Sequence, residues 1–317
     1  MGGVIARNEV DGGVLIELAE AKLSAGGDLS STASSAASIS ATVSGNVVAA
    51  ADPEADDTAG GPLAVNAVIA TNAIVGGAQV LVSDSLLRAD GGVHLATDVS
   101  STISADNSAV VSSDGIAAGV VLAFNTIGQA PSNIFAQAAD ALLGGVLAND
   151  QPIANEVVLL GTSVKAGGDV SVTAGALDSD AAHGARITAK IHNEATAGNA
   201  AAAAFVLATN AIATRNRVLV ALSDTAQPAD APRVGLTVGG QLSMVAADAA
   251  EIAADVSVAA DRACTSTCPP CRRLSPIPAP ICILAYRIKC GSGGQGDQGA
   301  RIPYFWRRTR MESIITA

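Results

Sequence analysis

The sequence of 317 residues predicts an all-β fold, a parallel β-solenoid that we expect to be a right-handed β-helix of about four degenerate repeat units, followed by a largely irregular C-terminal tail. Three observations lead to this prediction. Apolar and polar residues alternate along short stretches, which is typical of strands with one buried face. Several phrases recur in one order. Apolar residues make up 49% of the chain but aromatic residues only 2%, so the core must consist of thin layers of Ala, Val, Leu and Ile.

Each repeat unit begins with a phrase that contains an asparagine among apolar residues. The copies are "VIARNEV" (4–10), "VIATNAI" (68–74), "VLAFNTI" (121–127) and "VLATNAI" (206–212). Their asparagines are Asn8, Asn72, Asn125 and Asn210, which lie 64, 53 and 85 residues apart. These intervals indicate a unit of about 50 to 65 residues that tolerates loop insertions.

A second phrase of alternating apolar residues follows the first. It is formed by Ile16, Leu18, Leu23 and Ala25, and by Val80, Val82, Leu87 and Ala89, which lie 64 positions later. The third copy is Val157, Leu159, Val164 and Ala166. We expect the fourth to begin at Val220, Leu222 and Asp224, before an insertion that contains Pro228 and Pro232. The shared spacing indicates that equivalent strands stack on one another.

A glycine pair comes next in every unit, and we expect these pairs to form corners at which the backbone needs positive φ. The pairs are Gly26-Gly27, Gly91-Gly92, Gly167-Gly168 and Gly239-Gly240. In "VKAGGDVSVTAGA" (164–176), Val170 and Val172 should enter the core after the corner, while Asp169 stays outside and caps or hydrates the turn. Each unit closes with Ile-x-Ala, at Ile39, Ile103, Ile187 and Ile252.

Three strand-and-turn passes of about 18 to 21 residues would account for each unit, a size typical of solenoid coils. One segment, "GNAAAAAFVLATNAIATRN" (198–216), is rich enough in Ala to form a helix. Its counterpart at 116–127 is instead rich in Val and Gly and contains Phe124. The shared pattern therefore favours a strand in both places.

Charge divides the chain into a body and a tail. Residues 1–262 carry 10 Lys and Arg against 27 Asp and Glu, whereas residues 263–317 carry 8 against 2. We interpret residues 1–262 as a repetitive β-solenoid domain, whose acidity excludes nucleic acid as a partner. Residues 263–317 hold all five cysteines and the single Trp. This tail is expected to be disordered, or the product of a frame shift in the coding DNA.

The ends and the apolar runs give no sign of a membrane segment. "GGVIARNEV" after Met1 lacks the basic and apolar regions of a secretory signal peptide. Runs such as "IAAGVVLAF" (116–124) are too short to span a bilayer. We therefore expect no transmembrane segment.

The phrases "IARNEV", "VSDSLLRADGG" and "VKAGGDVSVTA" give the body, roughly residues 1–262, a family resemblance. It resembles the repetitive segments of very large bacterial secreted or surface proteins of the adhesin and hemagglutinin type. The resemblance implies a parallel β-solenoid that serves as a stalk or scaffold in adhesion at the cell surface, and it supplies no binding residues. Such proteins are usually far longer and carry a secretion signal. We therefore expect a fragment whose partners are neighbouring repeats of a longer chain, with host or cell-surface ligands.

Two groups of residues are candidate metal or redox ligands. Hard oxygen ligands that can hold Ca²⁺ come from Asp52, Glu54, Asp56 and Asp57, although neither an EF-hand loop nor the calcium repeat G-G-x-G-x-D occurs. The alternative is a charged loop that keeps an Ala-rich solenoid soluble. Cys268 and Cys271 have the spacing of a redox dithiol or half a zinc site. They lack a second close pair, and the alternative is a tail without selected function.

No catalytic constellation is evident, so we predict that the protein is not an enzyme and needs no cofactor. The histidines are His94, His183 and His192. His183 follows Asp178 and Asp180 and could form an acid–base pair, or could simply be a solvated loop residue. "GSGGQG" (291–296) matches a dinucleotide-binding pattern but has no βαβ unit around it.

The alternative from another class is a carbohydrate-active β-helix enzyme, a polysaccharide lyase or hydrolase. Such a site needs clustered carboxylates and aromatic platforms for sugar rings. The only aromatic residues of the body are Phe124, Phe135 and Phe205. A fragment without independent function is a further alternative.

Far-UV circular dichroism of residues 1–262 is expected to give a β-sheet spectrum, because the apolar spacing of two predicts strands throughout. A mainly helical spectrum would contradict the solenoid.

Overall fold

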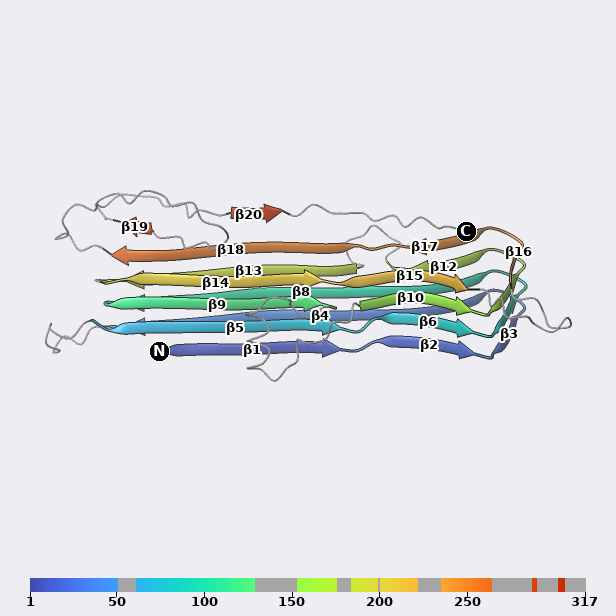
Figure 1. The fold of residues 1–317 in the computed structure, drawn as a ribbon, viewed down its shortest axis with the longest axis horizontal. Helices are drawn as coiled ribbons and strands as arrows, with labels where there is room; N and C mark the ends of the chain where they lie inside the picture. The colour runs from blue at the N-terminus through green and yellow to red at the C-terminus, as the bar shows by residue number, and fades with distance from the viewer. Residues whose placement is uncertain are drawn as a thin grey trace.

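The computed structural model describes residues 1–50, 61–128, 153–175, 184–198, 200–221 and 235–263, together with residues 287–289 and 302–305. Within these ranges every regular element is a β-strand and no helix occurs (Figure 1). All strand pairs are parallel except one that involves the last short strand. The predicted all-β class with parallel sheets is confirmed, and the arrangement is compatible with a parallel β-solenoid.

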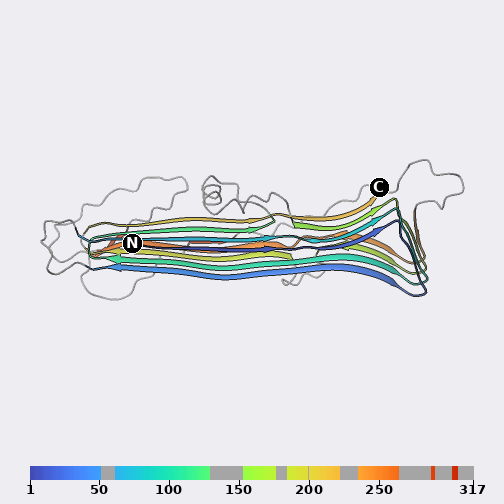
Figure 2. The same ribbon diagram turned by 90° about the horizontal axis from the view of Figure 1, so that it is seen from below.

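The chain repeats one circuit, which we call a coil. In coil 1, β1 (Gly2–Asp11) and β2 (Val14–Ala19) run out along one side, β3 (Lys22–Ala25) turns the corner, and β4 (Leu29–Ala49) returns. Coil 2 contains β5 (Leu63–Val75), β6 (Ala78–Ser83), β7 (Leu86–Ala89) and β8 (Val93–Ser113). The two long sides form two layers that meet at the corner (Figure 2).

Coils 3 and 4 follow the same path with a divided return strand. Coil 3 contains β9 (Ile116–Ile127), β10 (Ile153–Leu160), β11 (Ser163–Ala166), β12 (Val170–Ala174) and β13 (Gly184–Ala197). Coil 4 contains β14 (Ala202–Ile212), β15 (Thr214–Ala221), β16 (Leu236–Val238), β17 (Leu242–Ala246) and β18 (Ala250–Ala263). The Ala-rich segment within 198–216 is thus a strand, as predicted.

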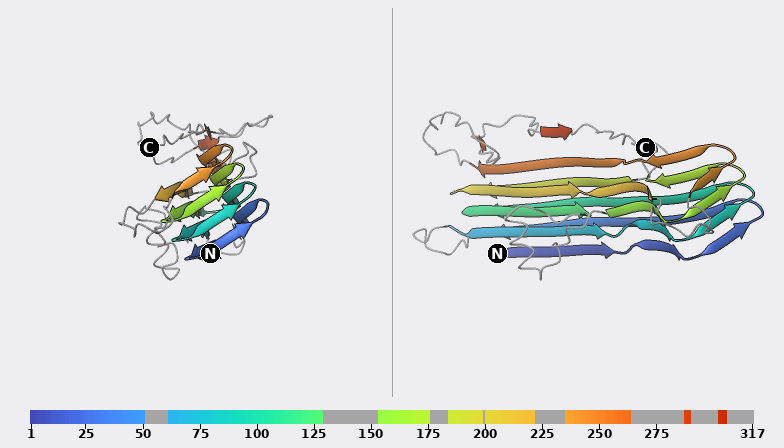
Figure 3. Two further views of the ribbon diagram at one scale, coloured as in Figure 1. Left: turned by 90° about the vertical axis from the view of Figure 1, so that its right-hand side faces the viewer. Right: turned by 45° about the vertical axis from the view of Figure 1, so that its right-hand side comes forward.

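Equivalent strands of successive coils pair to form four sheets. Sheet A has the order β1-β5-β9-β14, sheet B β2-β6-β10-β15 and sheet C β3-β7-β11-β16. Sheet D contains the return strands and two short strands of the tail, β19 (Arg287–Lys289) and β20 (Ile302–Phe305), which pair with β18. Figure 3 shows the coils stacked one above the other. The rest of the tail lies outside the described residues.

The expectation of three passes per unit is wrong, because one unit forms a single long coil. Each strand pairs with the same phrase of the next unit, as Ile16 does with Val80. The return strands β4 and β8 each run for 21 residues, or roughly 70 Å at about 3.3 Å per residue. Residues 29–49 contain small residues and no Pro, so nothing in this stretch ends the strand.

The stacking register follows the recurring phrases, with one correction. The closing isoleucines form a column in which Ile103 lies between Ile39 and Ile187. In the fourth unit, however, Val157 pairs with Val218 and not with the expected Val220. A shift of two residues keeps the same face inward, so the apolar pattern alone could not reveal it.

The glycine pairs do form the corners, but the expected positive φ is wrong. None of the eight glycines has a positive φ; this conformation occurs at other positions, among them the preceding corner at Glu20, Asp84 and Gly161. The glycines are required by close approach of the coil beneath. A Cβ at Gly167 would lie 2.2 Å from the carbonyl oxygen of Asp90, and one at Gly239 would lie 2.2 Å from that of Gly167.

The glycine pair of coil 2 is also displaced by one residue. Gly91 stacks between Gly27 and Gly168, and its amide donates to the Gly27 carbonyl at 3.0 Å. Gly92 consequently takes the place of an aspartate, and its amide donates to Oδ1 of Asp28 at 2.7 Å.

After the corner, the prediction for the phrase at 164–176 is confirmed. Val170 and Val172 are both only 1% exposed. Asp169 is exposed, and its Oδ1 accepts the backbone amide of Gln241 at 2.7 Å, which caps the corner of the next coil.

The core is a thin layer between the long sides. At the corner end it contains larger side chains, such as Leu87, Leu95 and Ile103. At the opposite end it is almost entirely alanine: Ala64, Ala117, Ala195, Ala197, Ala202, Ala204 and Ala260, with Val111. Small side chains let the two sheets approach closely there, which explains the scarcity of aromatic residues.

Replacing Gly167 by Ala is expected to lower the free energy of unfolding by about 1–3 kcal/mol, because the new Cβ meets the Asp90 carbonyl. The matched control is Gly26→Ala in the equivalent phrase of coil 1, where a Cβ would have no heavy atom within 4 Å. Urea denaturation of both variants measures the difference, and equal effects would contradict the close-approach explanation.

Candidate functional site

The repeat-marking asparagines form a continuous hydrogen-bonded ladder in sheet A. The Nδ2 of Asn8 donates to Oδ1 of Asn72 at 2.9 Å, Asn72 donates to Asn125 at 2.7 Å, and Asn125 donates to Asn210 at 2.8 Å. Asn72 and Asn125 are completely buried. The sequence marked these four residues, and the structure brings all of them together.

The ladder satisfies amide groups that point into the core. A side-chain amide can both donate and accept, so an identical residue one coil away supplies the missing partner. Asn107 in β8 shows what happens without one. It stacks between Val43 and Ile191, is completely buried, and neither its Nδ2 nor its Oδ1 has a hydrogen-bond partner. The Asn8–Asn72–Asn125–Asn210 ladder therefore favours this register over its neighbours.

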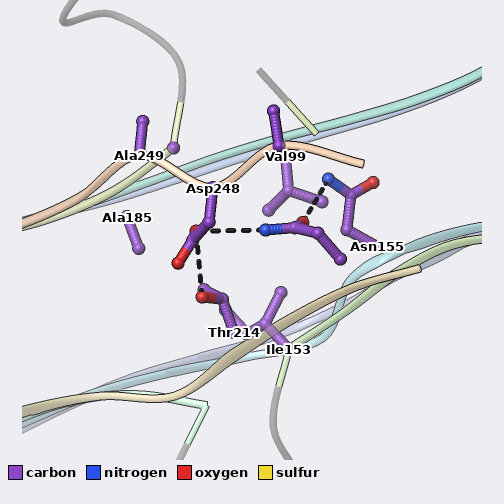
Figure 4. Close-up of a pocket in the computed structure, with 10 residues that line it drawn as sticks. Val99, Ile153, Asn155, Ala185, Thr214, Asp248 and Ala249 are labelled. Carbon is purple, nitrogen blue, oxygen red and sulfur yellow. Dashed lines mark hydrogen bonds between the residues drawn. The ribbon is translucent and has the colours of Figure 1, made fainter. Parts of the chain in front are cut away.

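A second, shorter ladder borders a small depression between sheets B and D (Figure 4). The Nδ2 of Asn155 donates to Oδ1 of Asn216 at 2.8 Å. Asn216 and the hydroxyl of Thr214 each donate to Oδ1 of Asp248 at 3.0 Å. The apolar side chains that line the depression include Val99 and Ile153.

Sequence reasoning missed Asp248 and this second ladder, although a signal was present. "ANEVVLL" (154–160) and "RNRVLVA" (215–221) both place an asparagine two residues before a valine. Aligning these asparagines would have given the correct pairing of Val157 with Val218. Chemically, the ladder ties sheet B to sheet D at the bend between β17 and β18, with the carboxylate as a shared acceptor.

One cluster on the outer face of sheet D combines a hydroxyl, an imidazole and a carboxylate. The Nδ1 of His192 lies 2.8 Å from Oγ of Ser257, its stacked neighbour in coil 4. The Nε2 of His192 lies 3.4 Å from a carboxylate oxygen of Glu194, and both side chains are more than 40% exposed. These are the groups of nucleophilic catalysis. The cluster lies on an open strand face, and β13 is paired on both sides, so its amides belong to the sheet rather than to an oxyanion hole.

The same outer face carries charges that alternate in sign from coil to coil. Lys190 stacks between Asp106 and Asp255, and Arg186 pairs with Glu251 at 2.8 Å. Such exposed pairs contribute little to stability, but opposite charges on stacked strands favour the observed register.

The remaining predicted site residues cannot be placed in the fold. The calcium candidates Asp52, Glu54, Asp56 and Asp57, the cysteines Cys268 and Cys271, and His183 with Asp178 and Asp180 lie outside the described residues. In the described part of the chain, no group of three or more His, Cys, Asp or Glu residues could hold a metal ion. Within the same part, no helix is long and apolar enough to cross a membrane.

The two described aromatic residues of the body lie away from the His192 cluster. Phe124 is completely buried. Phe205 is 38% exposed, but it belongs to β14 in sheet A, on the other side of the coil from sheet D. Phe135 lies outside the described residues.

No family model, no curated protein and no solved structure matches this chain. The link to adhesin repeats therefore depends on the recurring phrases of the sequence.

Two buried asparagines should respond in opposite directions to replacement by valine. Asn72→Val leaves Asn8 Nδ2 and Asn125 Oδ1 without their partner and should lower the free energy of unfolding by about 1–3 kcal/mol. Asn107→Val completes the apolar column with Val43 and Ile191 and should raise it by about 1–2 kcal/mol. Urea denaturation measures both, and a loss of stability in both variants would show that the ladder is not what distinguishes them.

Proposed function

We propose that this chain is a non-enzymatic structural segment of a secreted or cell-surface bacterial adhesin of the hemagglutinin type. In this proposal its body is a right-handed parallel β-solenoid of four repeat units that serves as part of a stalk or scaffold. The observation that carries the proposal is the uninterrupted Asn8–Asn72–Asn125–Asn210 ladder.

The ladder supports a scaffold role because it can continue through any number of coils. Each coil offers the same groups to the coil above and to the coil below, so further coils can be added without redesign of the interface. Repetition of apolar columns, such as Ile39, Ile103, Ile187 and Ile252, has the same property. A structure built in this way gains stability from the interface of every added coil.

The dimensions support a place within a longer chain. A side of roughly 70 Å is combined with a rise of only about 4.8 Å per coil, so four coils form a slab that is wider than it is tall. A stalk of this construction needs many coils. Neighbouring repeats of the same kind are therefore the natural partners of this segment.

The proposed handedness follows from a general rule. A strand that crosses over to a parallel strand of the same sheet does so in a right-handed sense in nearly all known folds. Each coil makes such a connection, for example from β1 through β2, β3 and β4 to β5.

The outer face of sheet D suits exposure to water. Seven of the ten outward residues of β4 carry hydroxyl side chains: Ser30, Thr32, Ser34, Ser38, Ser40, Thr42 and Ser44. Together with the charges of coils 3 and 4, these residues make the face largely polar, with exposed Val48 and Val245 as apolar exceptions, and it offers a surface for host or cell-surface ligands.

The test is labelling of intact cells of the encoding organism with an antibody raised against the outer face of sheet D. Cells should be labelled without permeabilisation, while an antibody against a cytosolic protein labels only lysed cells. Labelling confined to lysed cells would contradict the surface location. Cleavage of any member of a polysaccharide panel by the purified chain would instead favour the carbohydrate-active enzyme.

A further inference from the structure

We propose that coil 1 of one copy docks onto coil 4 of a second copy, so that the chain assembles head to tail. The inference rests on the solenoid part of the proposed function and is independent of the location and of the adhesin role. The partner is a second copy of this chain, whose coil 4 offers coil 1 the same kind of edge as the neighbouring repeat of the proposed function, because coil 4 already continues the columns of coil 1 residue by residue.

Both ends of the stack present open strand edges. The strands of coil 1, β1 to β4, each pair with coil 2 only, and β14 to β17 of coil 4 each pair with coil 3 only, among the described strands. An open edge carries a row of free backbone donors and acceptors and is a template for another strand. Exposed apolar residues accompany the lower edge, including Ile5, Leu15 and Val48.

Coil 1 keeps a glycine at a corner position where only a coil beneath it would require one. One corner column is glycine in every coil: Gly27, Gly91, Gly168 and Gly240. A Cβ at the upper three would lie 3.0–3.2 Å from the backbone carbon of the glycine below. A Cβ at Gly27 would have no heavy atom within 4 Å, so within a single copy this position has no need of glycine. Docking on Gly240 of a second copy supplies that need.

The asparagine ladder is complementary at its two ends. Asn8 donates to Asn72, but no described hydrogen bond reaches its own Oδ1. Asn210 accepts from Asn125, and no hydrogen bond among the described residues starts from its Nδ2. In a head-to-tail stack, Asn210 would lie beneath Asn8 of the next copy, offering the donor that Asn8 Oδ1 lacks. This bond would continue the ladder across the junction between the two copies.

Three apolar columns continue across the junction when the observed register is extended. Val218 would lie beneath Ile16, Leu242 beneath Leu29 and Ile252 beneath Ile39. Each pair is apolar.

The charges of the two surfaces do not conflict. Every pair that the register fixes contains at most one charged residue. Arg7 would lie on Thr209 and Glu17 on Leu219, while Asp255 would lie under Thr42. Like charges, which would oppose stacking, do not meet.

The short strands β19 and β20 are the part of the structure that competes with docking. They pair with Asp261–Ala263 and Ala253–Val256 of β18, which a stacked β4 would also need. Among the described residues, β19 and β20 pair only with these two short stretches, and docking has to displace these pairs. Because the two surfaces differ, the contact does not close on itself and generates an open-ended stack.

The test is sedimentation velocity of the full chain across a wide range of concentration. The mass should grow without limit as the concentration rises. Gly27→Val should raise the concentration needed for half-assembly about tenfold or more, because the added side chain meets the backbone beneath it. The matched comparison is Gly235→Val on the upper docking surface, where an added Cβ also has no heavy atom within 4 Å but the column holds Leu86 in coil 2 and Ser163 in coil 3, so a side chain there is compatible with stacking. It should assemble like the parent.

A second pair of variants covers the case in which Gly27→Val fails to fold. Leu15 is 54% exposed and would lie on Arg217 of the docked copy. Leu15→Arg should weaken assembly, with recovery at high salt, whereas Leu15→Glu should not weaken it. A chain that stays monomeric, a mass that stops at a dimer, or equal behaviour of the Arg and Glu variants would overturn the proposal. Surface labelling of cells would be unaffected by any of these outcomes.

Discussion

In-register stacking of parallel strands is the constraint on which the rest of this structure depends. Each residue lies one strand spacing, about 4.8 Å, from its counterpart in the next coil, so a side chain must be compatible with its equivalent. Apolar residues meet this requirement by forming columns such as Ile39, Ile103 and Ile187. A buried polar residue meets this requirement only if its counterpart in the next coil can form a hydrogen bond with it. The Asn72–Asn125 bond does so, whereas Asn107 between two aliphatic residues does not.

The same constraint explains the composition. Two long sheets face each other at a separation that alanine fills at one end, and nothing larger than Leu, Ile or Val is needed at the corner end. Glycine is kept at the corners because the carbonyl of one coil approaches the position that the Cβ of the next would take. Scarce aromatics and abundant glycine are therefore consequences of stacking. A fold that relies on stacking in this way can be lengthened by further coils, which is why we favour a scaffold over a catalyst.

Polar side chains that contact one another in this fold are brought together by the pairing of strands from different coils, not by their spacing in the sequence. His192 and Ser257 are 65 residues apart, yet they are direct neighbours in sheet D. Asp248 joins Thr214 and Asn216 from a different sheet. A single sequence lists such residues without linking them, because the insertions between phrases change the interval from unit to unit. The register between the third and fourth units could have been predicted only by aligning equivalent asparagines, such as Asn155 and Asn216.

The sequence by itself determined the all-β class, the order of the recurring phrases within a unit, the inward position of Val170 and Val172, and the four asparagines that mark the units. These features depend on apolar spacing and on recurrence, which are local properties of the chain. Only the tertiary structure decided that one unit makes one long coil, that the fourth unit is displaced by two residues at Val218, and that the corner glycines serve close approach rather than positive φ. Each of these features depends on contacts with the neighbouring coil. The apolar pattern cannot show a shift of two residues, because side chains alternate with a period of two and the same face stays inward.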